Sequence, residues 1–262
     1  ALRMICTGGE PWTEKPWKWL FQVIGKSKVP IMNSAGGTEV SGSILHCCLH
    51  RPFKVGSFNA PIPGMSADIL NLDGKKVPTN EMGELVMKKS SIGLTKSLWN
   101  DDKRYIDNYW SVIKDYWVHG DLASRDADGH WYLHGRSDDT IKVSGKRIGP
   151  SELESVIVKS GKAKEVAAVG IPDANKGSKI ILSIVPAENN DQKESFFEDL
   201  VIKDLGKSFK PDKVIFVKDL PKTRNMKIMR RVIKSCLANQ DPGDLSTLLN
   251  PESIEEIRSH AI

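Results

Sequence analysis

A lysine in a short polar turn, just ahead of a strongly basic amphipathic segment, is the first candidate for chemistry in this sequence. The stretch "LPKTRNMKIMRR" (220–231) surrounds Lys227 with further positive charges, which are Lys222, Arg224, Arg230 and Arg231. An isolated run of this kind is usually a solvated surface. Alternatively, the surrounding charges direct one ammonium group at a polyanion, because clustered positive charge attracts anionic ligands.

The composition sets limits on the class of protein. The 262 residues suffice for two domains, and 39% hydrophobic with 27% charged residues is typical of a soluble globular protein. No apolar run reaches the ~20 residues of a membrane-spanning helix. The formal net charge of +5 favours anionic partners. Aromatic residues do not alternate with basic ones in a stacking pattern, which argues against nucleic-acid binding.

Four cysteines are present, at Cys6, Cys47, Cys48 and Cys236. They form no C-x-x-C pair and no His/Cys cluster with zinc-ligand spacing. We therefore expect reduced thiols and a cytoplasmic protein. The first residues, "ALRMICTGGE", lack the pattern of a secretory signal and an initiator methionine. We expect the chain to begin inside a larger architecture.

The elements that must position these residues differ between the two parts of the chain. Residues 11–28 have the spacing of a helix that opens near Pro11, and residues 29–37 predict a buried strand that ends in a glycine turn. Between residues 53 and 87, short apolar runs alternate with Pro and Gly, and "MSADIL", "KKVP" and "GELVM" indicate strands of a sheet or partial barrel. A helical segment and a strand follow in 101–121.

After Arg136 strands and helices alternate, which predicts a small α/β unit. A helix is expected from Pro150, with Ser151 and Glu154 supporting its start. The turn "RSDD" is suited to a domain boundary, since its side chains can bond nearby backbone groups. The expected organisation is α/β (α+β), with residues 1–136 as the β-rich end of a large domain and residues 137–262 as a small α/β domain.

Five stretches together resemble the AMP-forming acyl-CoA synthetases of the adenylate-forming superfamily. They are "GGEPW", "GGTEVSG", "GEL", "YWVHGDLASRDADGHWYLHGRSDDTIKVSGKRIGPSELES" and "LPKTRNMKIMRR". They occur in the family's order, and the likeness extends over nearly the whole chain. It covers only the family's C-terminal half, because nothing matches its phosphate loop T-S-G-T-T-G-x-P-K-G. The resemblance implies that this loop lies upstream of Ala1 or in a separate chain.

The resemblance implies a two-step reaction, in which a carboxylate reacts with ATP to give an acyl-adenylate and the acyl group then passes to coenzyme A. Lys227 falls at the position of the catalytic lysine, where an ammonium group would offset repulsion between the carboxylate and the α-phosphate. The other basic residues of the stretch would strengthen a positive field toward ATP. The family usually has glycine before this lysine, and Met226 stands there instead, so the loop is expected to differ or the rate to be low.

The resemblance also implies a nucleotide site. Thr38 would donate to the α-phosphate, and Glu39 would hold the magnesium that accompanies ATP. Asp121 would accept hydrogen bonds from both ribose hydroxyls, and Arg136 would contact ribose and phosphate. The remaining nucleotide-binding positions implied are Gly9, Glu10, Pro11, Asn33, Ser34, Ala35, Gly36, Gly37 and Arg147. Without the family, these motifs would be ordinary polar turns, a helix start, a capping Asp and a boundary ion pair.

A hinge at Asp138 is implied, about which the small domain moves between an adenylating and a thioesterifying pose. In the second pose Ser144 and Gly145 would line the path of coenzyme A. Lys203 stands beside Ile202, where acetyl-CoA synthetases carry an arginine for the coenzyme's phosphates. The family can hold a structural metal through a histidine where Ser160 stands, so no tightly bound metal is expected.

The acyl pocket differs from that of acetyl-CoA synthetases. These enzymes have a Trp-Trp pair where Ala35 and Gly36 stand here, and the second indole limits the pocket to two or three carbons. Loss of that indole at Gly36 opens room for several methylenes, each worth about 0.8 kcal/mol on burial. The sequence therefore predicts an acid larger than acetate, such as a medium-chain, branched or aromatic acid.

The predicted function is the C-terminal part of an acyl-CoA ligase that uses ATP, magnesium and coenzyme A and needs an N-terminal partner half for activity. The alternative is a remnant that binds nucleotide or coenzyme A without turnover, which Met226, Ile202 and the missing loop favour. Adenylation that feeds a carrier-protein thiol or an oxidation is a third possibility.

Overall fold

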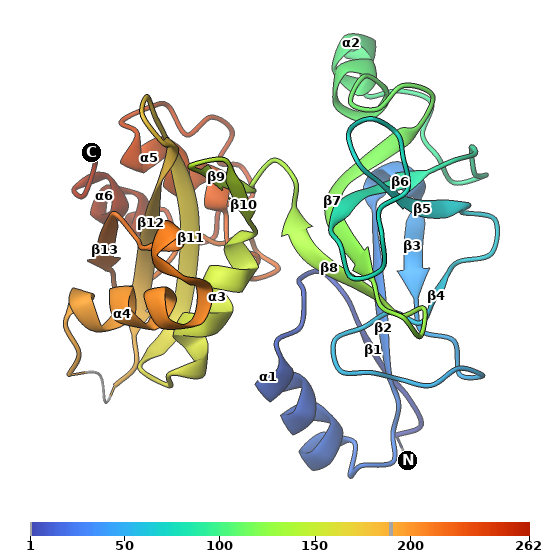
Figure 1. Cartoon of the computed structure of the whole chain (residues 1–262), viewed down its shortest axis with the longest axis horizontal. Coiled ribbons are helices and arrows are strands. Elements are labelled where there is room, and N and C mark those ends of the chain that lie inside the picture. Colours follow the sequence, from blue (N-terminus) through green and yellow to red (C-terminus); the bar gives the residue numbers. More distant parts are fainter. Residues whose placement is uncertain (1, 189–190) are drawn as a thin grey trace. The chain divides into compact units, whose positions relative to one another are not determined.

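The computed structural model describes residues 2–188 and 191–262, and it divides into two compact units. Unit 1 is Ala1–Ser137 and unit 2 is Asp138–Ile262. Helices and sheets occur in both units (Figure 1), which confirms the predicted mixed α/β class. Separate hydrophobic clusters lie inside each unit, as expected of regions that fold around their own cores.

Unit 1 contains two four-stranded sheets. The first has the order β1-β2-β3-β4, with β1 parallel to β2 and the other pairs antiparallel. Its strands are β1 (Ile5–Thr7), β2 (Ile31–Gly37), β3 (Gly42–His46) and β4 (Ala60–Pro61). The second sheet is antiparallel throughout. Its strands, in order, are β5 (Ala67–Leu70), β6 (Gly83–Met87), β7 (Trp117–Arg125) and β8 (Trp131–Arg136).

One apolar core joins the two sheets of unit 1. Ile44 and Leu45 from β3 lie in the same cluster as Leu85 from β6 and Trp117 from β7, and all four are fully buried. A buried Trp contributes a large apolar area to such a core. The predicted strands "MSADIL" and "GELVM" are confirmed as β5 and β6, but "KKVP" makes only a single bridge, from Lys76 to Leu70.

Two short helical segments complete unit 1. Helix α1 (Glu14–Trp19) continues into a π-helical turn, Leu20–Ile24, and starts three residues later than the expected opening at Pro11. Helix α2 (Asp102–Tyr105) continues into a similar turn, Ile106–Trp110. Asp101 caps α2 by accepting a hydrogen bond from the backbone N–H of Arg104 at 3.1 Å. This cap fixes the start of the segment that carries Tyr109.

Unit 2 is built on a three-stranded sheet with the order β11-β12-β13. Its strands are β11 (Ala163–Asp173), β12 (Gly177–Pro186) and β13 (Lys213–Phe216). A separate hairpin is formed by β9 (Ile141–Val143) and β10 (Lys146–Ile148). The helices are α3 (Pro150–Lys159), α4 (Glu194–Leu205), α5 (Arg230–Leu237) and α6 (Glu252–Arg258).

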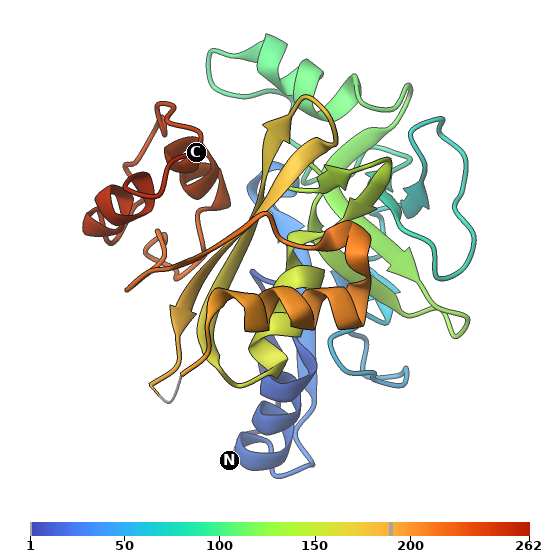
Figure 2. The ribbon, with the colours of Figure 1, turned by 60° about the vertical axis from the view of Figure 1, so that its left-hand side comes forward.

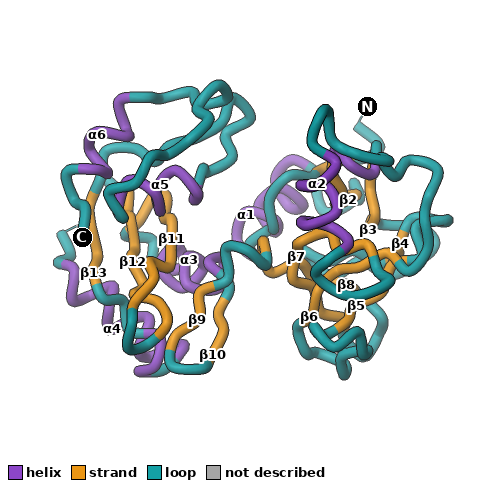
Figure 3. The backbone as a smooth tube through the Cα atoms, turned by 90° about the horizontal axis from the view of Figure 1, so that it is seen from above, coloured by secondary structure: helices purple, strands orange, loops and turns teal. Residues whose placement is uncertain are grey.

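Helices cover both faces of this sheet, as Figure 2 and Figure 3 show. Val166 and Ala168 of β11 pack in the cluster that contains α3 and α4, whereas Ala167 and Val169 pack in the cluster that contains α5 and α6. This division follows from the alternation of side chains along a strand. Because both faces are covered, the middle of β11 and of β12 carries consecutive apolar residues rather than alternating polar ones.

The start of α3 differs in detail from its prediction. Pro150 is the first helical residue as expected, but the carboxylate that closes the first turn belongs to Glu152, which accepts from the Gly149 N–H at 3.0 Å. The Glu154 carboxylate instead accepts from the Ala168 N–H and from Arg230. Helix α6 was not predicted, since its apolar pattern is short.

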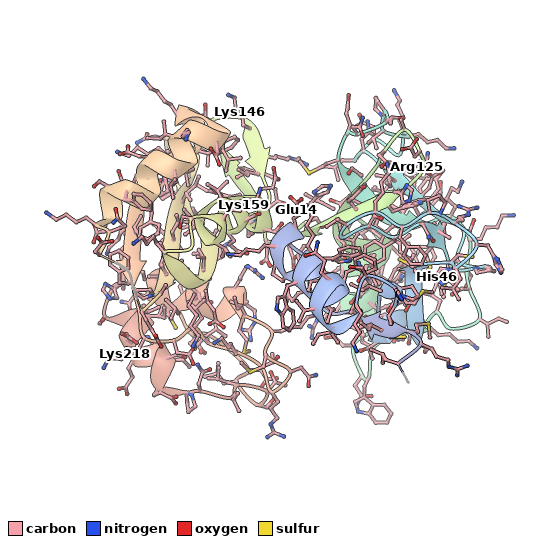
Figure 4. The ribbon with its side chains drawn as sticks, turned by 90° about the horizontal axis from the view of Figure 1, so that it is seen from below. Glu14, His46, Arg125, Lys146, Lys159 and Lys218 are labelled. Atoms are coloured by element: carbon pink, nitrogen blue, oxygen red, sulfur yellow. The ribbon has the colours of Figure 1, made fainter. Side chains whose placement is uncertain are left out.

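The hairpin between β7 and β8 is held by one carboxylate. Asp126 accepts from the backbone N–H groups of Asp128 and His130, and it forms an ion pair with Lys54 at 2.5 Å. At the end of β7, Arg125 (Figure 4) lies over the Trp131 ring, 5.3 Å from its centroid. These contacts fix the register of the two strands that carry Asp121 and Arg136.

We predict that Asp126→Asn lowers the free energy of unfolding of unit 1 by about 1–2 kcal/mol at pH 7. Burial alone would raise the pKa of Asp126, but the Lys54 ammonium and the His130 N–H outweigh burial and lower that pKa to about 2. A depressed carboxyl pKa stabilises the fold above the unfolded value of about 3.9 and loses that effect as pH falls through about 2.

Urea denaturation between pH 7 and pH 2 measures this effect, and most of the difference between variant and wild type should be lost at the acid end. Asp128→Asn is the matched control, because Asp128 also pairs with Lys54 but its side chain is 71% exposed. Equal destabilisation by both substitutions would contradict the assignment.

Candidate functional site

The predicted segment Gly9–Pro11 is exposed and follows the end of β1, whose last residues lie against β2. Thr7 is paired with Asn33, and the Ser34 hydroxyl donates to the Thr7 carbonyl at 3.2 Å. A Cβ at Gly8 would lie 2.9 Å from the Ser34 carbonyl oxygen, so the two backbones approach closely there. Because β1 and β2 are parallel, their carboxyl ends meet at one edge, which is where open α/β sheets bind ligands.

Strand β2 ends in two glycines that permit close backbone packing. A Cβ at Gly36 would overlap the carbonyl oxygen of Gly42 and lie 2.5 Å from the Cα of Ser43. No side chain fits at position 36 with this backbone. Ala35 lies before Gly36, at a register shift between β2 and β3. The close pairing of β2 with β3 therefore requires glycine at position 36.

Thr38 and Glu39 lie in the 3-10 turn Thr38–Val40 that follows β2. The Glu39 carboxylate accepts a hydrogen bond from the Tyr109 hydroxyl at 3.0 Å through Oε1, and its backbone carbonyl accepts from Thr95 at 2.7 Å. Burial, together with the neighbouring Glu39, raises the pKa of Tyr109 to about 12. Tyr109 is therefore a protonated donor at neutral pH and holds Glu39 in place.

Asp121 and Arg136 face each other across β7 and β8. They are directly paired in register, and Arg136 Nη1 lies 3.6 Å from Asp121 Oδ1. The same nitrogen donates to the backbone carbonyl of His119 at 3.0 Å. On its other side, Asp121 Oδ2 lies 3.3 Å from Nε2 of His119. The carboxylate is thus held between two nitrogen-bearing groups, and 17% of its side chain remains exposed.

The end of β2 and the middle of β7 meet at this point. A Cβ at Gly37 would lie 2.9 Å from Glu39 Oε2 and 3.2 Å from Cε1 of His119. The structure therefore brings Gly37, Thr38, Glu39, Asp121 and Arg136 to one edge of unit 1. Sequence reasoning did not identify Tyr109 or His119, although His119 stands two residues before Asp121 and so on the same face of an ideal strand.

The lysine turn is a tight loop between two bridged segments. Lys222 bridges to Ile228, the Thr223 N–H donates to the Lys227 carbonyl at 2.9 Å, and the Met226 N–H donates to the Thr223 carbonyl at 2.8 Å. Met226 has φ +63°, in the left-handed region. A three-residue turn of this kind places glycine at that position, and a side chain there costs roughly 1–2 kcal/mol. The backbone at position 226 thus has a conformation that favours glycine, although the residue is Met.

The charges around Lys227 are arranged differently from the expectation. Lys222 is buried and lies 2.6 Å from both Glu165 and Asp219. Burial by itself lowers the pKa of Lys222, but these two carboxylates outweigh burial and raise it above its ordinary value. Arg230 makes two bonds to Glu154, at 2.9 and 2.8 Å.

Arg231 donates to the backbone carbonyls of Pro242 and Asp244. Three of the four neighbouring cations are thus held within the fold, and two of them, Lys222 and Arg230, are paired with carboxylates, which corrects the prediction that all four strengthen a field toward a ligand. Lys227 itself is exposed, and in the described part of unit 2 its ammonium has no ion-pair partner.

The residues predicted for coenzyme A lie on separate elements of unit 2. Ser144 and Gly145 form the two-residue turn between β9 and β10, with φ values of 49° and 80°. This turn type needs positive φ at both positions, which explains Gly145. Arg147 is exposed on β10, next to Lys146, which is labelled in Figure 4. Lys203 is exposed in the last turn of α4, and Asp138 is the first residue of unit 2.

Comparison with known proteins places the chain in a family. The sequence profile of the AMP-binding enzyme matches residues 1–99, and that of the AMP-binding enzyme C-terminal domain matches residues 152–227. The acetyl-coenzyme A synthetase of Methanothrix thermoacetophila is 37% identical to it over 98% of this chain and 40% of that protein. The chain belongs to the AMP-binding enzyme family. It spans about 40% of the length of the curated relatives that it matches, and it corresponds to a C-terminal portion of them.

Solved structures of AMP-binding enzymes share the fold. The acetoacetyl-CoA synthetase from Streptomyces lividans superposes with a TM-score of 0.84 and 22% identity, over 98% of this chain and 40% of its own. The anthranilate CoA ligase AuaEII, solved in complex with anthranoyl-AMP, superposes with a TM-score of 0.73 and 26% identity, over 87% of this chain and 43% of its own.

Within residues 2–188 and 191–262, no helix has the length and apolarity needed to cross a membrane. Over the same ranges, no three side chains of His, Cys, Asp or Glu gather in a way that would hold a metal ion.

We predict that Gly36→Ala destabilises unit 1 by about 2 kcal/mol or more, since its Cβ would collide with backbone atoms that cannot move without breaking the pairing of β2 with β3. Thermal unfolding of the purified protein measures the loss. Gly42→Ala is the control, because a Cβ at Gly42 meets nothing within 4 Å. Similar unfolding temperatures for the two variants would contradict the prediction.

We also predict that Met226→Gly stabilises unit 2 by up to about 1 kcal/mol. The change removes a left-handed strain of roughly 1–2 kcal/mol, and the added freedom of the unfolded chain offsets about 0.4–1 kcal/mol of this gain. Met226→Ala keeps the Cβ and should give no such gain. Urea unfolding followed by circular dichroism measures both, and a glycine variant less stable than wild type would show that the Met226 side chain stabilises the turn.

Proposed function

We propose that this chain is the C-terminal part of an AMP-forming acyl-CoA synthetase, which activates a carboxylic acid with ATP and transfers the acyl group to coenzyme A. The observation that carries the proposal is the edge of unit 1 where Glu39, Asp121 and Arg136 come together. Two carboxylates and one guanidinium, each fixed by hydrogen bonds or strand pairing, form a polar set suited to the ribose, phosphate and cation of a magnesium nucleotide.

Each residue of this edge has a role in the proposal. Asp121 accepts from the two ribose hydroxyls, Arg136 contacts ribose and phosphate, and Thr38 donates to the α-phosphate. Tyr109 binds Oε1 of Glu39, while Oε2 faces Gly37. One carboxylate oxygen suits Mg²⁺, which keeps several waters and uses few protein ligands. Gly9, Glu10 and Pro11 pass the adenine, and Asn33, Ser34 and Ala35 are further nucleotide-binding positions.

Lys227 supplies the cation for the first step. Its ammonium lies between the carboxylate and the α-phosphate, so that it offsets the repulsion of two anions as the phosphoanhydride bond to pyrophosphate breaks. Because Lys222 and Arg230 are paired with carboxylates, the exposed charges of the short turn are those of Arg224 and Lys227. A rotation of unit 2 about Asp138 then brings Ser144 and Gly145 to the path of coenzyme A and Arg147 toward the AMP phosphate, with Lys203 near the phosphates of the coenzyme.

The missing part of the site belongs to an N-terminal half, on the same or another polypeptide, that carries the phosphate loop. We place the protein in the cytoplasm, because its four cysteines are all unpaired. Binding of AMP or coenzyme A without turnover in any assembly would favour the second reading, an inactive remnant.

We predict that Lys227→Ala abolishes adenylation by the assembled synthetase, with a loss of at least about 100-fold. ATP–pyrophosphate exchange measures this step directly. Lys234→Ala in α5 removes the same charge from another exposed position and should leave exchange within about twofold. Exchange that survives in Lys227→Ala would contradict the role of this lysine, even if coenzyme A transfer were slowed.

The acid is larger than acetate in this proposal. Gly36 stands where the second indole of acetyl-CoA synthetases would narrow the pocket, and it carries no side chain. We predict that hexanoate is preferred over acetate by at least about tenfold in pyrophosphate release, since each buried methylene contributes about 0.8 kcal/mol. An enzyme that prefers acetate would refute this assignment without affecting the role of Lys227.

A further inference from the structure

His119 is a buried histidine whose ring lies beside the proposed ribose carboxylate. It is 6% exposed, and across the described residues its Nδ1 atom is buried without a hydrogen-bond partner. Most buried polar atoms in proteins are paired, so an unpaired one needs an explanation. The environment of Nε2, the other ring nitrogen, explains why Nδ1 is left unpaired.

Nε2 of His119 faces a carboxylate. It lies 3.3 Å from Asp121 Oδ2, so a lone pair on Nε2 would oppose the negative oxygen. Electrostatics therefore assign the proton to Nε2, and in the neutral ring this leaves Nδ1 as the unpaired acceptor. The fold leaves one nitrogen unpaired while the other contacts Asp121.

The His119 ring is fixed by an aromatic stack. It lies 5.6 Å from the ring of Trp117, which stacks at 5.2 Å and 5° on Tyr109. Trp117 is fully buried, so this stack cannot turn freely. At its two ends stand polar groups that contact carboxylates: the Tyr109 hydroxyl on Glu39 and Nε2 of His119 on Asp121.

We propose that His119 is a positioning residue that holds the Asp121 carboxylate in the orientation needed to accept both ribose hydroxyls. The inference rests on the proposed function, because it takes Asp121 as the ribose acceptor. Arg136 constrains His119 and Asp121 from the other side, because its Nη1 donates to the His119 carbonyl and lies near Asp121 Oδ1. A carboxylate held on both sides loses little freedom when it binds a vicinal diol, which favours tight binding.

The ligand preference that follows is for a nucleotide with both ribose hydroxyls. The test compares the binding of AMP and 2′,3′-dideoxy-AMP to the intact protein by isothermal titration calorimetry. The wild type should bind AMP at least about tenfold more tightly than the dideoxy compound, as expected for hydrogen bonds to a charged group.

Three substitutions of His119 separate positioning from packing. His119→Gln extends an amide N–H toward the position of Nε2 and should keep most of the preference for AMP. His119→Asn carries its amide near the position of Nδ1 and should lose about tenfold in AMP affinity, as should His119→Ala. In all three variants the affinity for 2′,3′-dideoxy-AMP should change by no more than about twofold.

His130→Ala is the matched control. His130 is a second buried histidine of unit 1. Its Nδ1 makes no hydrogen bond among the described residues and lies 3.7 Å from Asp126 Oδ1, and its Nε2 contacts the Pro52 carbonyl, away from Asp121. This variant should lose stability and keep the AMP preference. Equal loss of AMP and dideoxy-AMP binding in the His119 variants, or an unchanged preference in His119→Ala, would overturn the inference.

A different binding result is expected if the proposed function itself is wrong. If the wild type does not bind AMP, or binds both nucleotides equally, then Asp121 is not the ribose acceptor and the proposed function loses its basis. A wild type that discriminates, with His119 variants that discriminate equally well, refutes only the role of His119.

Discussion

The antiparallel pairing of β7 with β8 is the constraint on which the proposed site depends. It places Asp121, which stands two residues after His119, opposite Arg136. The hydrogen bonds and ion pair of Asp126 hold the hairpin between the two strands and so fix this register. A slip of one residue would turn the Asp121 side chain to the other face of the sheet. The end of β2 reaches the same edge because the two sheets share one apolar core around Trp117. The apolar packing between the two sheets therefore brings the polar residues of this edge together.

The basic residues around Lys227 in unit 2 do not form a simple exposed basic patch. Lys222 is neutralised by Glu165 and Asp219, and Arg230 is neutralised by Glu154. These pairs hold the base of the lysine turn and the start of α5 against the sheet. The tip of the turn, with Met226 in a left-handed conformation, is left exposed. Strained backbone of this kind occurs at functional sites where the surrounding structure fixes it. A base fixed by ion pairs beneath an exposed tip suits the role proposed for Lys227.

Much of the fold could be predicted from the sequence, because its long elements have strong periodicity. Strands β2, β11 and β12 and helices α3, α4 and α5 follow from apolar patterns, and the mixed α/β class follows from their order. The prediction of "KKVP" as a strand was wrong, since a single bridge does not extend where Pro78 removes an N–H donor. Motif residues such as Asp121 and Lys227 could be selected by resemblance. Tyr109, His119 and the partners of Lys222 and Arg230 could not, because their roles depend on contacts between residues distant in sequence, such as Glu154 with Arg230.

We propose that the edge formed by Glu39, Asp121 and Arg136 binds an adenosine nucleotide through its ribose. A crystal structure of the protein with AMP would show whether it does. We expect both ribose hydroxyls within hydrogen-bonding distance of the Asp121 carboxylate, with His119 unmoved behind it. AMP bound elsewhere, or at this edge with its ribose turned away from Asp121, would refute this role of the edge.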